Sequence, residues 1–131
     1  MTIIVDTSVI IAVLTNEKNK KALIKITSGA DLATPYSLHW EICNAFTAMF
    51  KRNKIELKQA QTAIKYYYKI PVRFTDVNLS NVLSIAHTHN IYAYDAYFIE
   101  CAKNLNAPLL TLDKELKSVA EKLNIKTFEV S

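Results

Sequence analysis

Short apolar runs alternate with helical patterns along this chain. Four runs have the length and composition of buried strands, at residues 2–5, 30–35, 70–76 and 107–113, and a shorter run follows at 125–130. The segments between them carry apolar residues at helical spacing and predict helices at 7–14, 18–28, 37–52, 57–68, 78–90, 94–105 and 114–123. Apolar strands separated by helices indicate a mainly parallel sheet that is covered on both faces. We therefore expect an α/β fold, a three-layer α/β/α sandwich that residues 1–131 form as a single domain.

Composition narrows the class of protein. Half of the residues are hydrophobic and 21% are charged, which is the balance of a soluble globular domain. No apolar run approaches the roughly 18 residues of a membrane span. The run 8–14 is also too short for a signal peptide and has no basic stretch before it. We expect a cytoplasmic protein without a membrane partner, in which Cys43 and Cys101 are free buried thiols, although a single disulfide stays open.

The glycine content excludes two ways of binding phosphate. The chain has one glycine, Gly29, whereas a Walker A loop and a GxGxxG motif both need several. The net charge of +4 is compatible with an acidic partner. If the protein binds phosphate groups, it must use a metal ion or basic side chains.

Three aspartates follow or precede predicted strands. Asp6 comes directly after the first strand, Asp113 ends the fourth, and Asp95 lies at the head of the helix before that fourth strand. The carboxyl ends of parallel strands meet at one edge of a sheet, where ligands bind. Each aspartate can also serve as a helix N-cap, so Asp95 is open to two interpretations, as a cap or as a ligand.

Glu41 lies inside a predicted helix, where it cannot act as a cap. Its neighbours at minus three and plus four are Leu38 and Ala45, so it faces an apolar stripe. A buried glutamate without a partner costs several kcal/mol unless it is paired or binds a cation. The alternative is a Glu41 that is exposed at the edge of the stripe or paired with a lysine such as Lys51 or Lys54.

Four carboxylates drawn together suit a hard divalent cation. Mg²⁺ and Mn²⁺ prefer oxygen ligands, and they can activate a water and stabilise the charge on a phosphodiester. Asp6, Glu41, Asp95 and Asp113 would leave eight of the twelve acidic residues elsewhere, against sixteen basic ones. A positive periphery around an acidic centre favours a polyanionic substrate.

The segments IIVDTSVIIAVL, HWEICNAF, YAYDAYFIECA and PLLTLDKEL resemble the four signature segments of the PIN domain. Their order and spacing over essentially the whole chain are similar to those of the VapC-type toxins of toxin–antitoxin pairs. The resemblance implies a Mg²⁺- or Mn²⁺-dependent endoribonuclease that cleaves single-stranded or loop RNA. It also implies that Asp6, Asp95 and Asp113 bind the metal directly, while Glu41 helps to bind it or positions water.

The resemblance further implies supporting residues and partners. Hydroxyl groups near the first and last acids fall on Ser8 and Thr111, where they would hydrogen-bond to carboxylates or water, the alternative being plain capping and strand packing. A homodimer is implied, together with a small antitoxin that covers or enters the acidic groove. Two alternatives stay open: a PIN-like module that binds RNA or protein without cleaving it, and a nuclease of RNA maturation without an antitoxin.

Other features favour ordinary roles. The three histidines, His39, His87 and His89, lack partners at zinc-ligand spacing and are expected to be surface or packing residues. A dehalogenase-like phosphatase would need an aspartate where Ser8 stands. Tyrosines at 92, 94 and 97 flank Asp95 and can either stack on unpaired bases or pack in the core.

Overall fold

The computed structural model describes residues 1–130, which form four strands and seven helices. The strands are β1 (Thr2–Val5), β2 (Asp31–Pro35), β3 (Val72–Thr75) and β4 (Leu109–Leu110). The helices are α1 (Thr7–Leu14), α2 (Lys20–Thr27), α3 (Ser37–Lys51), α4 (Leu57–Tyr67), α5 (Leu79–His89), α6 (Ala93–Leu105) and α7 (Lys114–Lys122). The alternation of strands and helices expected from the apolar pattern is confirmed.

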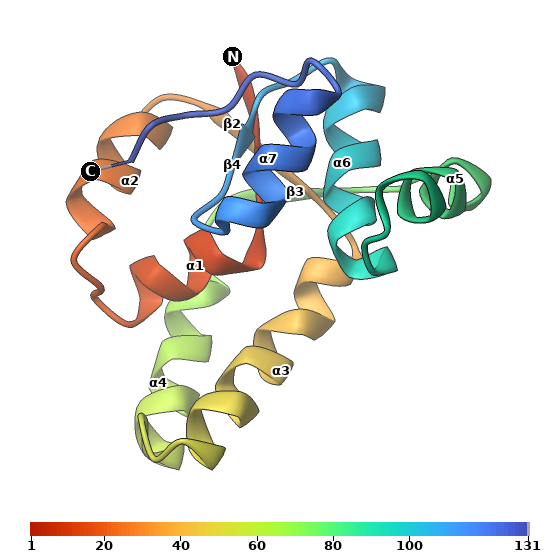
Figure 1. Cartoon of the computed structure of the whole chain (residues 1–131). Coiled ribbons are helices and arrows are strands. Elements are labelled where there is room, and N and C mark those ends of the chain that lie inside the picture. Colours follow the sequence, from red (N-terminus) through yellow and green to blue (C-terminus); the bar gives the residue numbers. More distant parts are fainter. Residues whose placement is uncertain (131) are drawn as a thin grey trace.

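The four strands form one parallel sheet in the order β3-β2-β1-β4. The chain moves outward from β1 through β2 to β3 and then returns to β4 on the other side of β1. Right-handed crossovers therefore place α1–α4 on one face and α5–α7 on the other. Figure 1 shows α6 and α7 in front of the sheet, and α6 contacts β1, β2 and β4. The three-layer α/β/α architecture is thus confirmed.

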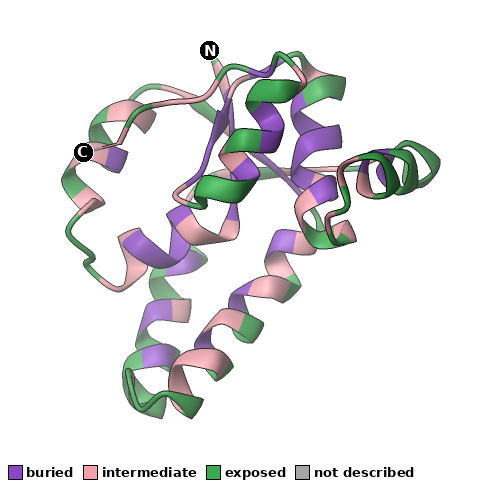
Figure 2. Ribbon diagram, in the orientation of Figure 1, coloured by how far each residue is buried: buried purple, intermediate pink, exposed green. Residues whose placement is uncertain are grey.

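The core lies along the central strand and the inner faces of the helices (Figure 2). Ile3, Ile4 and Val5 of β1 are all buried because helices cover both faces of this strand. Leu23 of α2 is buried on one side, and Ile99 of α6 is buried on the other. Continuous apolar strands, rather than alternating ones, are what such double coverage requires.

Helices α3 and α4 form a hairpin that extends away from the sheet (Figure 1). Asn53 lies in the turn between them with φ of 54°, in the left-handed region. Because the chain has one glycine, asparagine takes this conformation at several helix ends. The asparagines with positive φ within residues 1–130 are Asn16, Asn53, Asn90, Asn106 and Asn124.

Three local expectations need correction. The strand predicted at 125–130 is reduced to a single parallel bridge between Leu109 and Thr127. The strand predicted at 107–113 spans only β4, because the residues after Leu110 hydrogen-bond to side chains near β1 instead of extending the ladder. Cys43 is exposed on the outer face of α3, whereas Cys101 is buried, and both thiols are free.

No helix within residues 1–130 combines the length and the apolar character that crossing a membrane would need.

Candidate active site

The carboxyl ends of β1 and β4 mark the point where the strand order reverses. Strand β1 is followed by β2 on one side and is bordered by β4 on the other, and such a switch point opens a crevice at the sheet edge. The register pairs Val5 with Leu110, so the next residues, Asp6 and Thr111, are brought side by side. The sequence therefore places its first acid at the position where parallel α/β sheets bind ligands.

Asp6 is buried at this point, with 4% of its surface exposed. As the N-cap of α1 its Oδ1 accepts a hydrogen bond from the Val9 backbone N–H at 3.2 Å and one from Ser8 Oγ at 2.6 Å. Its other oxygen, Oδ2, accepts a hydrogen bond from Thr111 Oγ1. Both carboxylate oxygens are thus oriented by the protein.

Ser8 and Thr111 also hold the segment that follows β4. Ser8 Oγ accepts a hydrogen bond from the Leu112 backbone N–H at 3.0 Å, and Thr111 Oγ1 accepts one from the Asp113 backbone N–H at 3.0 Å. The two hydroxyl groups therefore join Asp6 to the loop that carries Asp113. Hydrogen bonding to a carboxylate, as the resemblance implied for these hydroxyls, is what the structure shows.

Asp113 is the N-cap of α7. Its Oδ1 accepts hydrogen bonds from the backbone N–H groups of Glu115, at 2.9 Å, and Leu116, at 3.1 Å. The side chain is otherwise exposed. Asp113 therefore satisfies helix backbone with one oxygen and leaves the other without a hydrogen bond from residues 1–130.

Asp95 is not a helix cap. The N-cap of α6 is Tyr92, and Asp95 is the third residue of the helix, half-buried. Among residues 1–130 nothing donates a hydrogen bond to its carboxylate. Burial raises the pKa of Asp95, and the negative charges of Asp113 and Glu115 raise it further. The capping alternative for Asp95 is excluded.

Glu41 lies in the second turn of α3 with its carboxylate turned inward. Its Oε2 is buried and has no hydrogen-bond partner within residues 1–130. Burial raises the pKa of Glu41 to about 7, and the charges of Asp95 and Asp6 add to the effect. Ser37 Oγ, one turn earlier, partly opposes the rise in this pKa without the geometry of a full hydrogen bond.

These four acids, here called the acidic cluster, influence one another electrostatically. Burial raises the pKa of Asp6 to about 6; the hydrogen bonds from Ser8, Thr111 and Val9 oppose this rise, and the charge of Asp113 adds to it. These electrostatic interactions join Asp6 to Asp113 and to Glu41, and they join Asp95 to Glu41 and to Asp113. Each acid of the cluster thus interacts with two of the other three.

The acidic cluster has no basic counterpart in the described part of the chain. The ion pairs within residues 1–130 are Arg73–Asp31 and Lys117–Glu129, both away from the cluster. Glu41 is therefore paired with neither Lys51 nor Lys54. A buried carboxylate without a hydrogen bond or a counterion fits a cation-binding role.

The donor set fits a hard divalent ion, since all four ligands are carboxylates. As the side chains stand, no three His, Cys, Asp or Glu residues within 1–130 converge closely enough to hold one ion. An ion would have to draw these repelling groups together.

Two features of this edge escaped the sequence analysis. Glu115 raises the pKa of Asp95 through its charge, and only its position two residues after Asp113 could have suggested it. Within residues 1–130, three buried side-chain oxygen atoms have no hydrogen-bond partner: Thr7 Oγ1, Ser37 Oγ and Glu41 Oε2. Thr7 and Ser37 follow β1 and β2, so all three atoms belong to segments that start at this edge.

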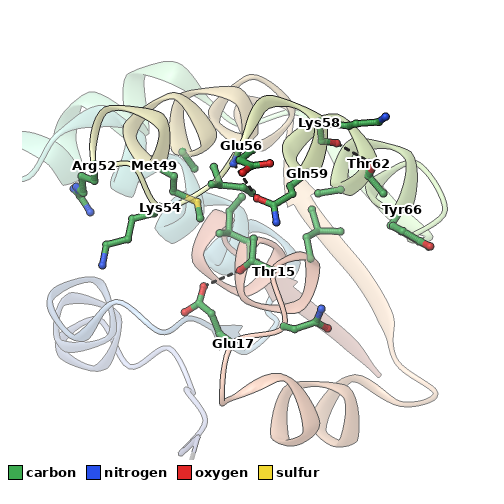
Figure 3. Close-up of a pocket in the computed structure, with 16 residues that line it drawn as sticks. Thr15, Glu17, Met49, Arg52, Lys54, Glu56, Lys58, Gln59, Thr62 and Tyr66 are labelled. Atoms are coloured by element: carbon green, nitrogen blue, oxygen red, sulfur yellow. Dashed lines mark hydrogen bonds between the residues drawn. The ribbon is translucent and has the colours of Figure 1, made fainter.

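A large hollow lies elsewhere, between α1, α3 and α4 (Figure 3). It has a volume of about 1090 Å³. Apolar side chains line its floor: Ile11, Leu14, Ala45, Met49, Ile55 and Ala63. Figure 3 shows Arg52 and Lys54 at one end and Lys58 at the other. We call this feature the hairpin groove; it contains none of the four acids of the cluster.

Known structures share this fold. PAE2754 from Pyrobaculum aerophilum is 22% identical, with a TM-score of 0.72 over 94% of this chain and 86% of that one. VapBC2 from Rickettsia felis, bound to a DNA fragment from their promoter, is 12% identical, with a TM-score of 0.69 over 100% of both chains. FitAcB from Neisseria gonorrhoeae is 17% identical, with a TM-score of 0.57 over 97% of this chain and 96% of that one.

Sequence comparison gives a family as well. No curated protein sequence matches the chain. The family described as PIN domain, however, matches residues 3–122, a span that includes Asp6, Glu41, Asp95 and Asp113. With the parallel sheet, the switch-point acids and this match over most of its length, the chain belongs to the PIN domain family.

Proposed function

We propose that this protein is a Mg²⁺- or Mn²⁺-dependent endoribonuclease that cleaves single-stranded or loop RNA in the cytoplasm, as the toxin of a VapC-type toxin–antitoxin pair. The observation that carries the proposal is the acidic cluster, in which neighbouring carboxylates help to raise the pKa of Asp6, Glu41 and Asp95, and which has no basic partner within residues 1–130. Membership of the PIN domain family, whose members are generally nucleases, supports the same conclusion.

Each acid has a role in this proposal. Asp6, Asp95 and Asp113 would hold the ion, and Glu41 would help to bind it or orient water. A bound Mg²⁺ or Mn²⁺ ion supplies Lewis-acid activation of water and neutralises charge on the phosphodiester. Ser8 and Thr111 keep both oxygens of Asp6 in place through the hydrogen bonds described above.

The first test is thermal unfolding of the wild type and of Asp95→Asn, each with Mn²⁺ and with a chelator. At one hundred times its dissociation constant, the ion should stabilise the wild type by about 2.7 kcal/mol. For a domain of this size that corresponds to a rise in Tm of roughly 10 °C. The rise should vanish in Asp95→Asn.

Cleavage of an unstructured RNA is the second part of the test. A nuclease requires both the metal-dependent rise in Tm and metal-dependent cleavage. Binding of RNA without either effect would favour the alternative of a non-catalytic PIN-like module. A nuclease that forms no complex with the product of an adjacent gene would favour the alternative of RNA maturation.

We further propose that an antitoxin docks in the hairpin groove. The likeness of the sequence to VapC-type toxins implies an antitoxin partner, and VapBC2 is among the structures that share this fold. An apolar floor with charged ends suits an amphipathic helix, which places its apolar face in such a groove. Met49→Glu would put a charge on that floor and should weaken the complex with the adjacent gene product. Unchanged affinity would direct the search to the acidic edge, where the antitoxin would cover the cluster itself.

The homodimer is also a proposal, and an exposed aromatic face supports it. Tyr36, Trp40 and Tyr68 are exposed beside the edge strand β3, and Leu79 of α5 borders the same hollow as Tyr36. Exposed apolar surface of this kind indicates a protein interface. Trp40→Glu should shift a dimer to monomer in sedimentation velocity, and an unchanged dimer would place the interface elsewhere.

A further inference from the structure

Two exposed tyrosines at the start of α6 have no aromatic partner. Most other exposed aromatic side chains contact one: Tyr36 stacks on Phe74, and Trp40 and Tyr68 pair with His39. Tyr66 lies under the ammonium group of Lys69. Within residues 1–130, only Tyr92 and Tyr94 among the exposed aromatics take part in no such pair.

Tyr92 has the larger exposed surface and the closer relation to the acidic cluster. Tyr92 is 84% exposed, the highest value among the exposed large hydrophobic residues described, and Tyr94 is 55% exposed. Tyr92 is the N-cap of α6, with an extended backbone, and Asp95 is the third residue of the helix, so both belong to its N-terminal turn. Tyr94 directly precedes Asp95 within the helix and leaves the helix axis about 100° away from it.

We propose that Tyr92 is a specificity-determining residue, whose ring stacks on an unpaired base of the RNA beside the acidic cluster that includes Asp95. This inference rests on the proposed function, because it takes RNA as the substrate. An exposed aromatic face stacks on any base, and its contact requires that the base be unpaired. A single ring at the edge of the cluster would thus select flexible RNA over duplex.

The surroundings of Tyr92 favour a base over a protein partner. A protein interface has an apolar centre from which charged residues are depleted. Tyr92 instead begins the turn of α6 that carries Asp95, one of the four charged residues of the acidic cluster. The aromatic face around Trp40 and the hairpin groove have the apolar character that Tyr92 lacks.

The test measures binding of a short unstructured RNA by fluorescence anisotropy, with Ca²⁺ in place of Mg²⁺ or Mn²⁺. Tyr92→Ala should weaken binding by about 5- to 150-fold, the range that one base–aromatic stack supports. Tyr92→Phe should bind like the wild type because it keeps the ring. Tyr94→Ala is the matched control and should also bind like the wild type.

RNAs with one abasic position, moved along the strand, then test for stacking itself. One abasic position should weaken binding to the wild type and have no effect on Tyr92→Ala, because the partner of the lost base is already absent. Wild-type affinity of Tyr92→Ala, or an equal abasic effect in both proteins, would overturn the inference. A changed oligomeric state of Tyr92→Ala with unchanged RNA binding would make Tyr92 a protein contact instead.

Cleavage in Mn²⁺ separates this inference from the function on which it rests. RNA binding with the expected Tyr92 pattern but without cleavage would leave the stacking contact standing and overturn the nuclease. Cleavage of RNA together with unchanged RNA binding by Tyr92→Ala would support the nuclease and overturn the stacking contact. A wild type that neither binds nor cleaves RNA would overturn both.

Discussion

The acidic cluster contains two kinds of carboxylate. Asp6 and Asp113 follow strands, cap α1 and α7, and accept hydrogen bonds from the backbone. Glu41 and Asp95 project from within helices and have no clear hydrogen bond from residues 1–130. The first pair caps helices and so has a structural reason to be present, whereas the second pair has no hydrogen bond in the described residues that offsets the cost of its burial.

This difference shows which variants can separate an effect on the reaction from an effect on folding stability. Changing a strand-end acid removes a helix cap along with a charge, so a loss of activity can come from a loss of structure. Changing Asp95 or Glu41 relieves repulsion and leaves the caps intact. Variants of the helix acids therefore report on function more directly than variants of the strand-end acids.

The largest effect is expected for cleavage by Asp95→Asn. Removing the charge of a metal ligand should lower the rate of RNA cleavage by at least about 100-fold, since changes even in residues behind the ligands cost 10- to 100-fold. The Tm of the metal-free variant should stay the same or rise. Asp76→Asn is the control for removing one aspartate charge, because Asp76 follows β3 and lies outside the cluster. A drop in the metal-free Tm of Asp95→Asn would show that Asp95 has a structural role after all.

Asp6→Ala should cause the largest loss of stability. It removes the cap of α1 and leaves the hydroxyl groups of Ser8 and Thr111 without their shared acceptor. We expect a loss of about 2 to 3 kcal/mol in the free energy of unfolding, measured by urea denaturation at about pH 5, where Asp6 is mostly protonated in the fold and its removal relieves little buried charge. Asp6→Asn keeps an acceptor and should lose less. Equal losses for both variants would mean that charge, rather than hydrogen bonding, sets the stability at this position.

The pH dependence of the metal-free protein follows from the raised pKa values. In the folded state the pKa is about 6 for Asp6 and about 7 for Glu41, above the ordinary values of 3.8 and 4.5. Between the ordinary and the raised pKa, the folded state retains a proton that the unfolded state has released. The free energy of unfolding should therefore fall as the pH rises from about 4 to about 7, with Asp6 contributing on the order of 3 kcal/mol.

Urea denaturation at a series of pH values, with a chelator, measures this loss. Glu41→Gln should be less sensitive to pH than the wild type in the upper part of the range. Mn²⁺ should oppose the loss, because a cation binds the deprotonated carboxylates. If the free energy of unfolding of Glu41→Gln depends on pH as that of the wild type does, the carboxyl group of Glu41 must be exposed to water.

The smallest effect is expected for Asp113→Ala. Loss of the α7 cap should cost about 1 kcal/mol of folding stability, while Asp113→Asn should retain most of it because asparagine caps well. Asp95→Ala, measured in the same denaturation series, should lose less stability than Asp113→Ala, because Asp95 caps no helix. A larger loss for Asp95→Ala than for Asp113→Ala would reverse the division between the two kinds of acid.

The sequence was sufficient for the sheet and for the position of the strand-end acids. Buried parallel strands are continuous apolar runs, and a residue directly after such a run lies at the carboxyl edge in any parallel sheet. The position of Asp95 within its helix was less accessible, because Tyr92 rather than an aspartate begins α6. Glu115 was missed because its effect on Asp95 depends on how α7 and α6 lie in space. The prediction of a strand at 125–130 was wrong because β4 is only two residues long and offers little edge for pairing.

Trp40 gives the molecule an intrinsic optical reporter. It is the only tryptophan of the chain, it is 74% exposed, and it directly precedes Glu41 in α3. A change of charge at Glu41 alters the electric field at the indole, whereas self-association through the aromatic face would remove water from it. The first signal should follow the metal concentration at any protein concentration, and the second should follow the protein concentration alone. The emission of one unlabelled side chain thus distinguishes occupation of the cluster from assembly of the dimer.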